Sequence, residues 1–203
     1  MIADFICGLT KLISGVSVRW LGVQPEDKPR VYFANHTSHL DFIVLWAALP
    51  KDIRLKTRPV AARDYWAKGR LRNYLARKVF NAVLIDRKHL CAHDEEHNPI
   101  HLMTEVLDQG YSLIIFPEGT RNLEDNIGPF KSGLYHLHKQ RPASELVPVY
   151  LENFNRILPK GEFIIIPILG SVTFGKPLAQ VKAETKVDFL NRARQALEEL
   201  KNR

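Results

Sequence analysis

Residues 31–49 read VYFANHTSHLDFIVLWAAL, and this stretch decides the fold. Val31 to Ala34 form a short apolar run that is typical of a buried strand. Leu40 to Leu49 form a longer apolar run that favours a helix, and Pro50 stops it. The polar residues 35–41 therefore lie on a strand-to-helix turn.

The same alternation of strand and helix continues along the chain. Further strands are expected at residues 79–85, 113–116, 146–151, 163–167 and 171–175. One helix is expected to begin at Asn98-Pro99 and to end at Gly110, and the last one opens at Thr185. This pattern predicts a single α/β domain, a sandwich of helices around a mostly buried mixed sheet.

The N-terminal segment carries the apolar stripe of an amphipathic helix. Its apolar residues recur at steps of three and four: Ile2, Phe5, Ile6, Leu9, Leu12, Ile13, Val16 and Trp20. Asp4, Lys11 and Arg19 interrupt the stripe, which argues against a membrane-spanning helix and against a signal peptide. We expect residues 1–24 to form a membrane-surface helix and residues 25–203 to form the main domain. A first helix packed on the core explains the periodicity equally well.

The composition is that of an ordinary globular protein with an excess of positive charge. The 203 residues are 45% hydrophobic and carry 29 Lys and Arg against 22 Asp and Glu, a formal net charge of +7. Such a charge favours an anionic partner, whether phospholipid, phosphorylated substrate or nucleic acid. The two cysteines, Cys7 and Cys91, provide neither a disulfide framework nor a zinc spacing, which fits a reducing, cytosolic setting.

The turn at residues 35–41 places a histidine and a carboxylate five positions apart. On a regular helix, residues at this spacing do not share a face, so His36 and Asp41 meet only if His36 precedes the first regular turn. A carboxylate that accepts one imidazole N–H leaves the other ring nitrogen to take a proton from a hydroxyl. The pair is therefore a candidate general base.

Three other uses of this stretch stay open. His36, His39 and Asp41 are all possible metal ligands, although no second cluster completes a shell. Ser38 is a possible nucleophile, although the chain has no Gly-x-Ser-x-Gly elbow. Finally, His36 and Asp41 can be a turn residue and a first-turn acidic residue with purely structural roles.

A second polar motif follows the expected strand at residues 113–116. It reads Phe116-Pro117-Glu118-Gly119-Thr120-Arg121 and combines a tight turn with a carboxylate, a hydroxyl and a guanidinium group. The glycine lets backbone N–H groups approach a phosphate, and the arginine can hold two phosphate oxygens. Lys131 offers a second cation. A solvated turn is the alternative interpretation.

Taken in order, four motifs resemble the glycerolipid acyltransferase family, which includes 1-acylglycerol-3-phosphate acyltransferases. They are Asn-His-x-Ser-x-x-Asp at residues 35–41, Ile85-Asp86-Arg87, the motif at residues 116–121, and Val147-Pro148-Val149-Tyr150. The resemblance spans roughly residues 30–175, and four ordered motifs are far more specific than any one of them.

The resemblance implies acyl transfer without a metal or other cofactor. His36 would deprotonate an acceptor hydroxyl and Asp41 would orient His36, while acyl-CoA or an acyl carrier protein would supply the thioester. Glu118, Gly119, Thr120 and Arg121 would shape the acceptor site, with Arg121 on the acceptor phosphate and with Arg87 and Lys131 as further cations. The expected acceptor is a lysophospholipid, most directly 1-acylglycerol-3-phosphate. The expected location is the cytoplasmic face of a membrane.

Other acceptors and other functions stay open beside this one. They are another lysolipid or lyso-amino-lipid, hydrolysis of the thioester, or lipid binding without turnover.

Two further patterns are weaker candidates. His89, His93, His97 and His101 recur every four residues, as the ligands of a metal site on a helix would. Asp94 follows His93, however, where the zinc-protease pattern needs Glu. The basic stretch at residues 51–78 carries Tyr65, Trp66 and Tyr74, which could stack on nucleic-acid bases or could belong to the core. The same stretch suits a membrane or an acidic carrier protein, and we expect no nucleic-acid partner.

Overall fold

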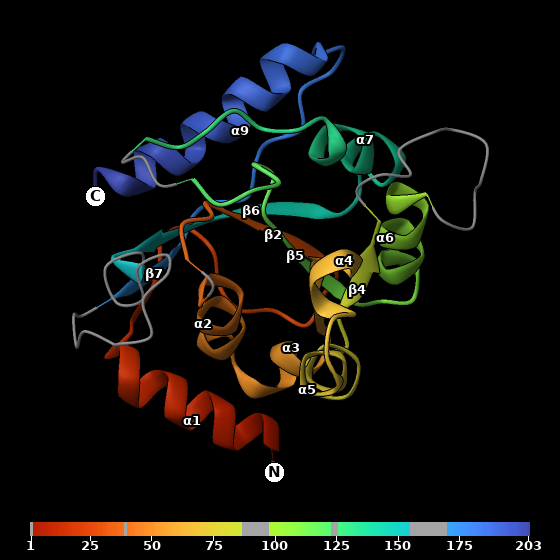
Figure 1. Cartoon of the computed structure of the whole chain (residues 1–203). Helices are drawn as coiled ribbons and strands as arrows, with labels where there is room; N and C mark the ends of the chain where they lie inside the picture. The colour runs from red at the N-terminus through yellow and green to blue at the C-terminus, as the bar shows by residue number, and fades with distance from the viewer. Residues whose placement is uncertain (1, 39, 87–97, 123–125, 155–169) are drawn as a thin grey trace.

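A mixed sheet of seven strands runs through the computed structural model, which describes residues 2–38, 40–86, 98–122, 126–154 and 170–203 (Figure 1). The strands are β1 (Ser17–Trp20), β2 (Arg30–Ala34), β3 (Thr57–Ala62), β4 (Val83–Ile85), β5 (Ser112–Ile115), β6 (Glu145–Glu152) and β7 (Ser171–Phe174). Their order in the sheet is β1-β7-β6-β2-β5-β3-β4. Neighbouring strands are parallel except β6 and β7, which are antiparallel.

Helices cover both faces of the sheet. They are α1 (Ile2–Ser14), α2 (Asp41–Ala48), α3 (Lys51–Leu55), α4 (Arg63–Trp66), α5 (Arg70–Tyr74), the π-helix η1 (Leu75–Val79), α6 (Pro99–Asp108), α7 (Gly133–Gln140) and α9 (Lys186–Lys201). α1 and α2 pack on one face, and α6, α7 and α9 pack on the other (Figure 1). The predicted α/β sandwich is confirmed.

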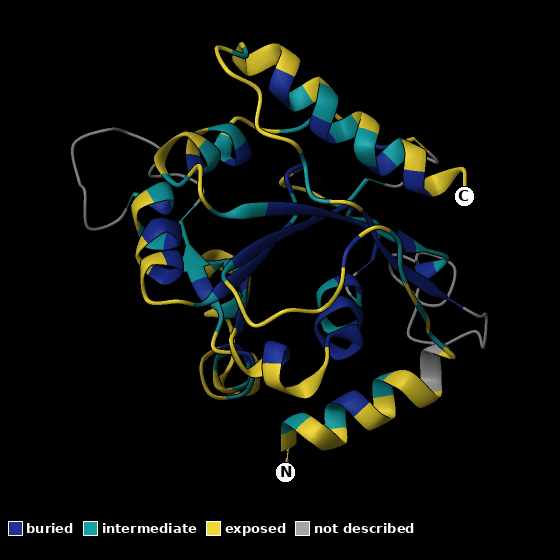
Figure 2. Cartoon of the chain, turned by 180° about the vertical axis from the view of Figure 1, so that it is seen from behind, coloured by how far each residue is buried: buried dark blue, intermediate teal, exposed yellow. Residues whose placement is uncertain are grey.

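β2 lies at the centre of the sheet and explains why there are two cores. All five of its residues are buried, as a parallel strand covered on both faces requires (Figure 2). Tyr32 and Ala34 belong to the core beneath α2, whereas Val31 and Phe33 belong to the core beneath α6, α7 and α9. Because side chains alternate along a strand, one five-residue segment joins both layers.

The two predicted helix starts are confirmed by their caps. The side chain of Asn98 accepts a hydrogen bond from the backbone N–H of Ile100 at 2.9 Å, with Pro99 at the first helical position. Thr185 accepts one from the N–H of Asp188 at 3.2 Å. Both contacts satisfy N–H groups that the first turn of a helix leaves without a partner.

The N-terminal helix is shorter than the stripe of apolar residues predicted. It ends at Ser14, because Gly15 takes the left-handed backbone conformation (φ 51°) that commonly terminates a helix. Residues 17–20 then form β1, which pairs with β7, and Trp20 stacks on Phe174 with ring centroids 3.9 Å apart. Val16 and Trp20 therefore do not belong to the helix, and the sheet begins well before residue 25.

Two further predictions differ from the structure. The basic stretch contains a strand, β3, whose alternation is concealed by Arg58 within it and by Arg54, Lys56 and Arg63 on either side. Residues 75–79 form a π-helix, so the predicted strand at 79–85 is wrong for its first four residues and correct for residues 83–85. The strand predicted at 163–167 lies outside the described residues.

The sheet topology places two of the predicted motifs side by side. β2 and β5 are adjacent and parallel, with Phe33 paired to Ile115. The turn at residues 35–41 and the motif at residues 116–121 follow these two strands directly. Both motifs therefore meet at the edge formed by the carboxyl ends of the strands, where open α/β sheets bind ligands.

Candidate functional site

The end of β2 is fixed by the side chain of Asn35. Its Nδ2 donates to the carbonyl of Leu151 at 2.9 Å, and its Oδ1 accepts from the N–H of Leu151 at 2.8 Å. The amide thus continues the pairing of β2 with β6 one step beyond the strand, and Asn35 is buried. His36 consequently starts from a fixed backbone position.

His36 and Asp41 form the predicted contact. Nδ1 of His36 lies 2.9 Å from Oδ2 of Asp41, and α2 begins at Asp41, so His36 does precede the first regular turn. A carboxylate beside Nδ1 selects the tautomer with its proton on that nitrogen. Nε2 then carries the lone pair, and the His36 side chain is 23% exposed.

The Asp41 carboxylate also organises the loop between β2 and α2. The same Oδ2 accepts the backbone N–H groups of Thr37 at 2.6 Å and Ser38 at 2.8 Å, and the side chain is fully buried. Three N–H groups on one oxygen fix the position and orientation of the carboxylate. Its place in the first turn of α2 is favourable too, because the N-terminus of a helix stabilises negative charge.

The two motifs are joined through the backbone of His36. Its N–H donates to Oε1 of Glu118 at 2.9 Å, and its carbonyl accepts the N–H of Asn122 at 2.8 Å. Phe116 lies against the imidazole, with ring centroids 4.4 Å apart and nearly parallel planes. The motif at residues 116–121 therefore supports His36 from one side while Asp41 orients it from the other.

Glu118 is buried and bound to backbone on both of its oxygens. Oε1 accepts from His36, and Oε2 accepts the N–H of Gly128 at 3.1 Å. Burial raises the pKa of this carboxyl, while the two backbone hydrogen bonds lower it. A Cβ on Gly128 would lie 2.8 Å from Oε2, so any other residue here would force the Glu118 carboxylate to shift. These contacts make Glu118 a brace for the site, in addition to the acceptor contact predicted from the resemblance.

Gly119 and Lys131 are brought together as a second part of the site. The N–H of Lys131 donates to the carbonyl of Pro117 at 2.7 Å, and Gly119 has a φ of 74°. A Cβ on Gly119 would lie 3.3 Å from Cγ of Lys131, so glycine lets the lysine side chain cross the turn.

Arg121 lies within the same turn as Gly119. It is half-buried, whereas Thr120 and Lys131 are exposed. In the described part of the chain neither Arg121 nor Lys131 forms an ion pair. Two cations that form no ion pair with a described residue are thus available on the motif that supports His36, as the predicted anion site requires.

The predicted site residues thus fall into two groups: those that the structure brings together, and Arg87, which it does not describe. His36, Asp41, Glu118, Gly119 and Lys131 are linked by the contacts above, and Thr120 and Arg121 share their turn. Arg87 lies outside the described residues, as do His89, His93 and His97. Within the described ranges no three His, Cys, Asp or Glu side chains are grouped in the way a metal ion would need.

The sequence did not reveal the residues that hold the site together. Asn35, Phe116 and Gly128 act through long-range contacts with β6, His36 and Glu118. Only the position of Asn35 directly after a buried strand could have suggested its role.

A sequence profile described as acyltransferase matches residues 16–152. The 1-acyl-sn-glycerol-3-phosphate acyltransferase of Limnanthes douglasii is 30% identical over 178 residues, 85% of this chain and 58% of that protein. The corresponding alpha enzyme of Homo sapiens is 32% identical over 160 residues, 75% of this chain and 51% of that protein. The chain therefore spans little more than half the length of these relatives.

A solved structure has the same fold. The crystal structure of the 1-acyl-sn-glycerophosphate acyltransferase from Thermotoga maritima matches with a TM-score of 0.74, over 100% of this chain and 80% of that one. The sequence identity is 20%, so the likeness concerns the arrangement of sheet and helices.

Proposed function

Since the chain belongs to the acyltransferase family, we propose that it transfers a fatty acyl group from a thioester to the hydroxyl of 1-acylglycerol-3-phosphate, giving phosphatidic acid. The observation that carries the proposal is the His36–Asp41 contact, together with Arg121 and Lys131, which form no ion pair with any described residue. A base and an anion site next to each other suit an acceptor that carries both a hydroxyl and a phosphate.

The proposed reaction needs one base and no covalent enzyme intermediate. Nε2 of His36 takes the proton of the acceptor hydroxyl as the oxygen attacks the thioester carbonyl. The tetrahedral intermediate then expels the thiolate, which receives that proton from the imidazolium. Asp41 holds the ring in the correct tautomer and stabilises the positive charge that develops on it. Arg121 and Lys131 hold the phosphate, so the hydroxyl is presented to His36.

We also propose that the protein works at a membrane surface, at its cytoplasmic face. α1 packs next to α2 and contributes Ala3, Ile6 and Cys7 to the core on that face of the sheet. Its other face carries four exposed apolar side chains: Ile2, Phe5, Leu9 and Leu12, which are 50%, 70%, 44% and 82% exposed. No helix in the described ranges has the length and apolar character needed to cross a bilayer.

Further exposed apolar residues support the surface contact. Leu55 of α3 and Leu71 of α5 are 62% and 71% exposed, and both helices lie on the same side of the molecule as α1 (Figures 1 and 2). Lys51, Lys68, Arg70 and Arg72 are exposed in the same region of the chain. Apolar side chains surrounded by cations are typical of a surface that binds anionic lipid.

The test is acyl transfer by the purified protein with each donor and a panel of lysolipids, with products identified by mass spectrometry. The donors are acyl-CoA and acyl carrier protein. We expect phosphatidic acid from 1-acylglycerol-3-phosphate, and loss of at least about a hundredfold in rate for His36→Ala. His136→Ala, which removes an exposed histidine of α7, is the matched control and should keep its activity.

Each other outcome points to a different function. If only another lysolipid is acylated, His36 is still the base but the acceptor is not 1-acylglycerol-3-phosphate. Release of free acid at a rate that no lysolipid alters indicates a thioesterase. Lipid binding that survives in His36→Ala, with no turnover in the wild type, indicates a binding protein.

A further inference from the structure

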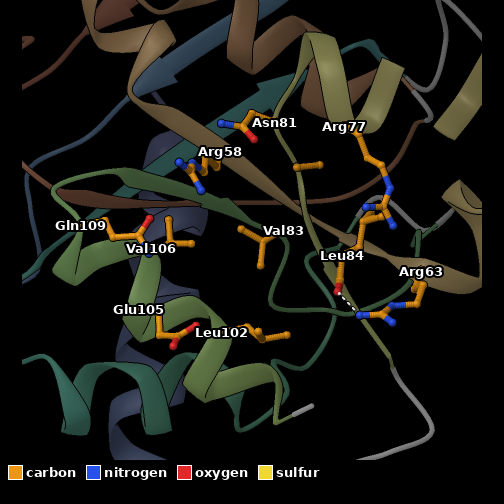
Figure 3. Close-up of a pocket in the computed structure, with 11 residues that line it drawn as sticks. Arg58, Arg63, Arg77, Asn81, Val83, Leu84, Leu102, Glu105, Val106 and Gln109 are labelled. Atoms are coloured by element: carbon orange, nitrogen blue, oxygen red, sulfur yellow. Dashed lines mark hydrogen bonds between the residues drawn. The ribbon is translucent and has the colours of Figure 1, made fainter. Parts of the chain in front are cut away.

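A groove lined by arginine side chains lies along the edge strand β4, and none of the site residues above lines it. Its volume is about 310 Å³. Figure 3 shows the side chains that line it. Val83, Leu102 and Val106 give it an apolar part. Its three arginines come from three elements: Arg58 of β3, Arg63 of α4 and Arg77 of η1.

The charge of this arginine groove is unbalanced. Among the described residues Glu105 is the single acidic side chain in the lining, and it lies 3.4 Å from Nε2 of His101. None of the three arginines forms an ion pair with any residue that the structure describes. Guanidinium groups that share a pocket repel one another, and a bound anion relieves that repulsion.

The guanidinium group of Arg58 is held in place by the protein. It lies over the ring of Tyr111, with Cζ 3.7 Å from the ring centroid. Its Nε is buried, and in the described part of the chain this atom has no hydrogen-bond partner. Arg63 uses one N–H for the carbonyl of Leu84, at 3.4 Å, which leaves the rest of its fork for a ligand.

An irregular turn brings η1 to the groove. The N–H of Ala82 reaches back to the carbonyl of Ala76 at 2.8 Å, and Asn81 takes a left-handed conformation with φ 49°. This exit from the π-helix leads directly into β4 and puts Arg77 and Asn81 on the same groove (Figure 3). Single π-turns occur often at functional sites.

We propose that the arginine groove binds a phosphate ester. Planar guanidinium forks match the oxygens of a phosphate, and the volume lies at the lower end of the range of about 300–1,000 Å³ found for small-molecule pockets. An apolar part beside the cations suits a phosphate carried on a larger body, whether a nucleotide or a lipid.

The position of the groove favours the nucleotide end of coenzyme A as the source of this phosphate. Arg63 directly follows the carboxyl end of β3, and β3 lies two strands from β2. At the usual strand spacing, β2 and β3 are about 10 Å apart. Arg63 and His36 both follow the carboxyl ends of these strands, so both lie at the same edge of the sheet. A thioester at His36 and phosphates at the groove are thus within reach of one extended donor. This choice of source rests on the proposed function, whereas phosphate binding does not.

Direct titration tests the site without turnover. Adenosine 3′,5′-bisphosphate, inorganic phosphate and a soluble short-chain phosphatidic acid are titrated separately into the whole protein by calorimetry. We expect saturable binding of the bisphosphate, weakened at least about tenfold in the double variant Arg63→Gln, Arg77→Gln. Arg194→Gln with Arg203→Gln, on and after α9, removes the same charge and should bind like the wild type.

The other outcomes are equally clear. If phosphatidic acid binds more tightly than the bisphosphate, and the double variant Arg63→Gln, Arg77→Gln loses this binding, the groove is a phosphate site whose ligand is a lipid headgroup. Equal weakening in the control variant, or no arginine-dependent saturation by any of the three ligands, overturns the proposal. A failure of acyl transfer leaves these titrations unaffected, so the two proposals fail separately.

Discussion

Asp41 holds three N–H groups on one buried oxygen, and the geometry of the site depends on it. The ring of His36 and the backbone of Thr37 and Ser38 all take their positions from this carboxylate. Removing its negative charge while keeping its shape therefore separates its effect on His36 from its effect on the loop.

Asp41→Asn is expected to lower kcat by about a hundredfold to ten-thousandfold while leaving the KM for the acceptor nearly unchanged. The amide no longer stabilises the imidazolium, and its NH2 group can select the wrong tautomer. Steady-state kinetics measures both constants, and Asp108→Asn, an exposed carboxylate paired with Arg141, is the matched control. A rise in KM with constant kcat would show that Asp41 serves acceptor binding instead.

Glu118 should give the stability of the protein a measurable pH dependence. Burial raises the pKa of Glu118 above its ordinary value of 4.5, so the folded state binds its proton more tightly than the unfolded state does. Its contribution to stability is thus fully present below the unfolded pKa and is lost as the pH rises through the folded pKa.

The comparison with Glu118→Gln isolates this effect. As the pH rises from the unfolded to the folded pKa of Glu118, the free energy of unfolding of the wild type should fall relative to that of the variant. Urea denaturation at a series of pH values measures this difference. A relative rise would mean that the hydrogen bonds from His36 and Gly128 outweigh burial.

At the level of residues, the sequence predicted the contact between His36 and Asp41 but not the residues that support it. His36 and Asp41 could be paired because a turn between a strand and a helix is readable from apolar runs. The brace by Glu118 could not be predicted, since its partners are backbone N–H groups of residues 82 and 10 positions away. Hydrogen bonds of that kind leave no periodic pattern in a sequence.

Among the elements, the boundary between α1 and β1 is the one that apolar periodicity misplaced. Val16 and Trp20 continue the helical stripe by spacing, but Gly15 ends the helix and the sheet takes over. β3 was missed for a related reason, because charged residues flank and enter it. By contrast, β2, α6, β5 and α9 were predictable, since each combines an apolar pattern with a clear start or stop.

Two truncations distinguish the helix from the strand. Removing residues 1–14 leaves all seven strands and should yield a folded protein. Removing residues 1–22 also takes away β1 and the stacking of Trp20 on Phe174, at a further cost of about 3 kcal/mol or more in unfolding free energy. Denaturant unfolding of the two truncated proteins gives the difference directly. Equal stabilities would mean that β1 contributes nothing to the sheet.

On the scale of the whole molecule, α1, α3 and α5 present exposed apolar residues on one side. Because the whole protein has a net charge of +7, we expect an anionic bilayer as the partner of this side, and binding should weaken as salt is added. The apolar part of the contact can be reduced without touching the core.

The double variant Phe5→Ser, Leu12→Ser is expected to fold normally and to bind anionic vesicles at least about tenfold more weakly, because burying each side chain is worth about 1.5–3 kcal/mol. Co-sedimentation with phosphatidylglycerol vesicles measures the change. Val187→Ser removes an exposed apolar side chain of α9 and serves as the control. Unchanged sedimentation of the double variant would rule out α1 as the contact.

The pairing of β1 with β7 has a consequence for how the protein is made. Ser17 can pair with Ser171 only after residue 171 has left the ribosome, because β1 pairs with β7. Contacts so distant along the chain form late and slow the completion of the native sheet. α1 is therefore synthesised long before the edge strand beside it is paired, so in the proposed membrane role it could meet lipid before the sheet is complete.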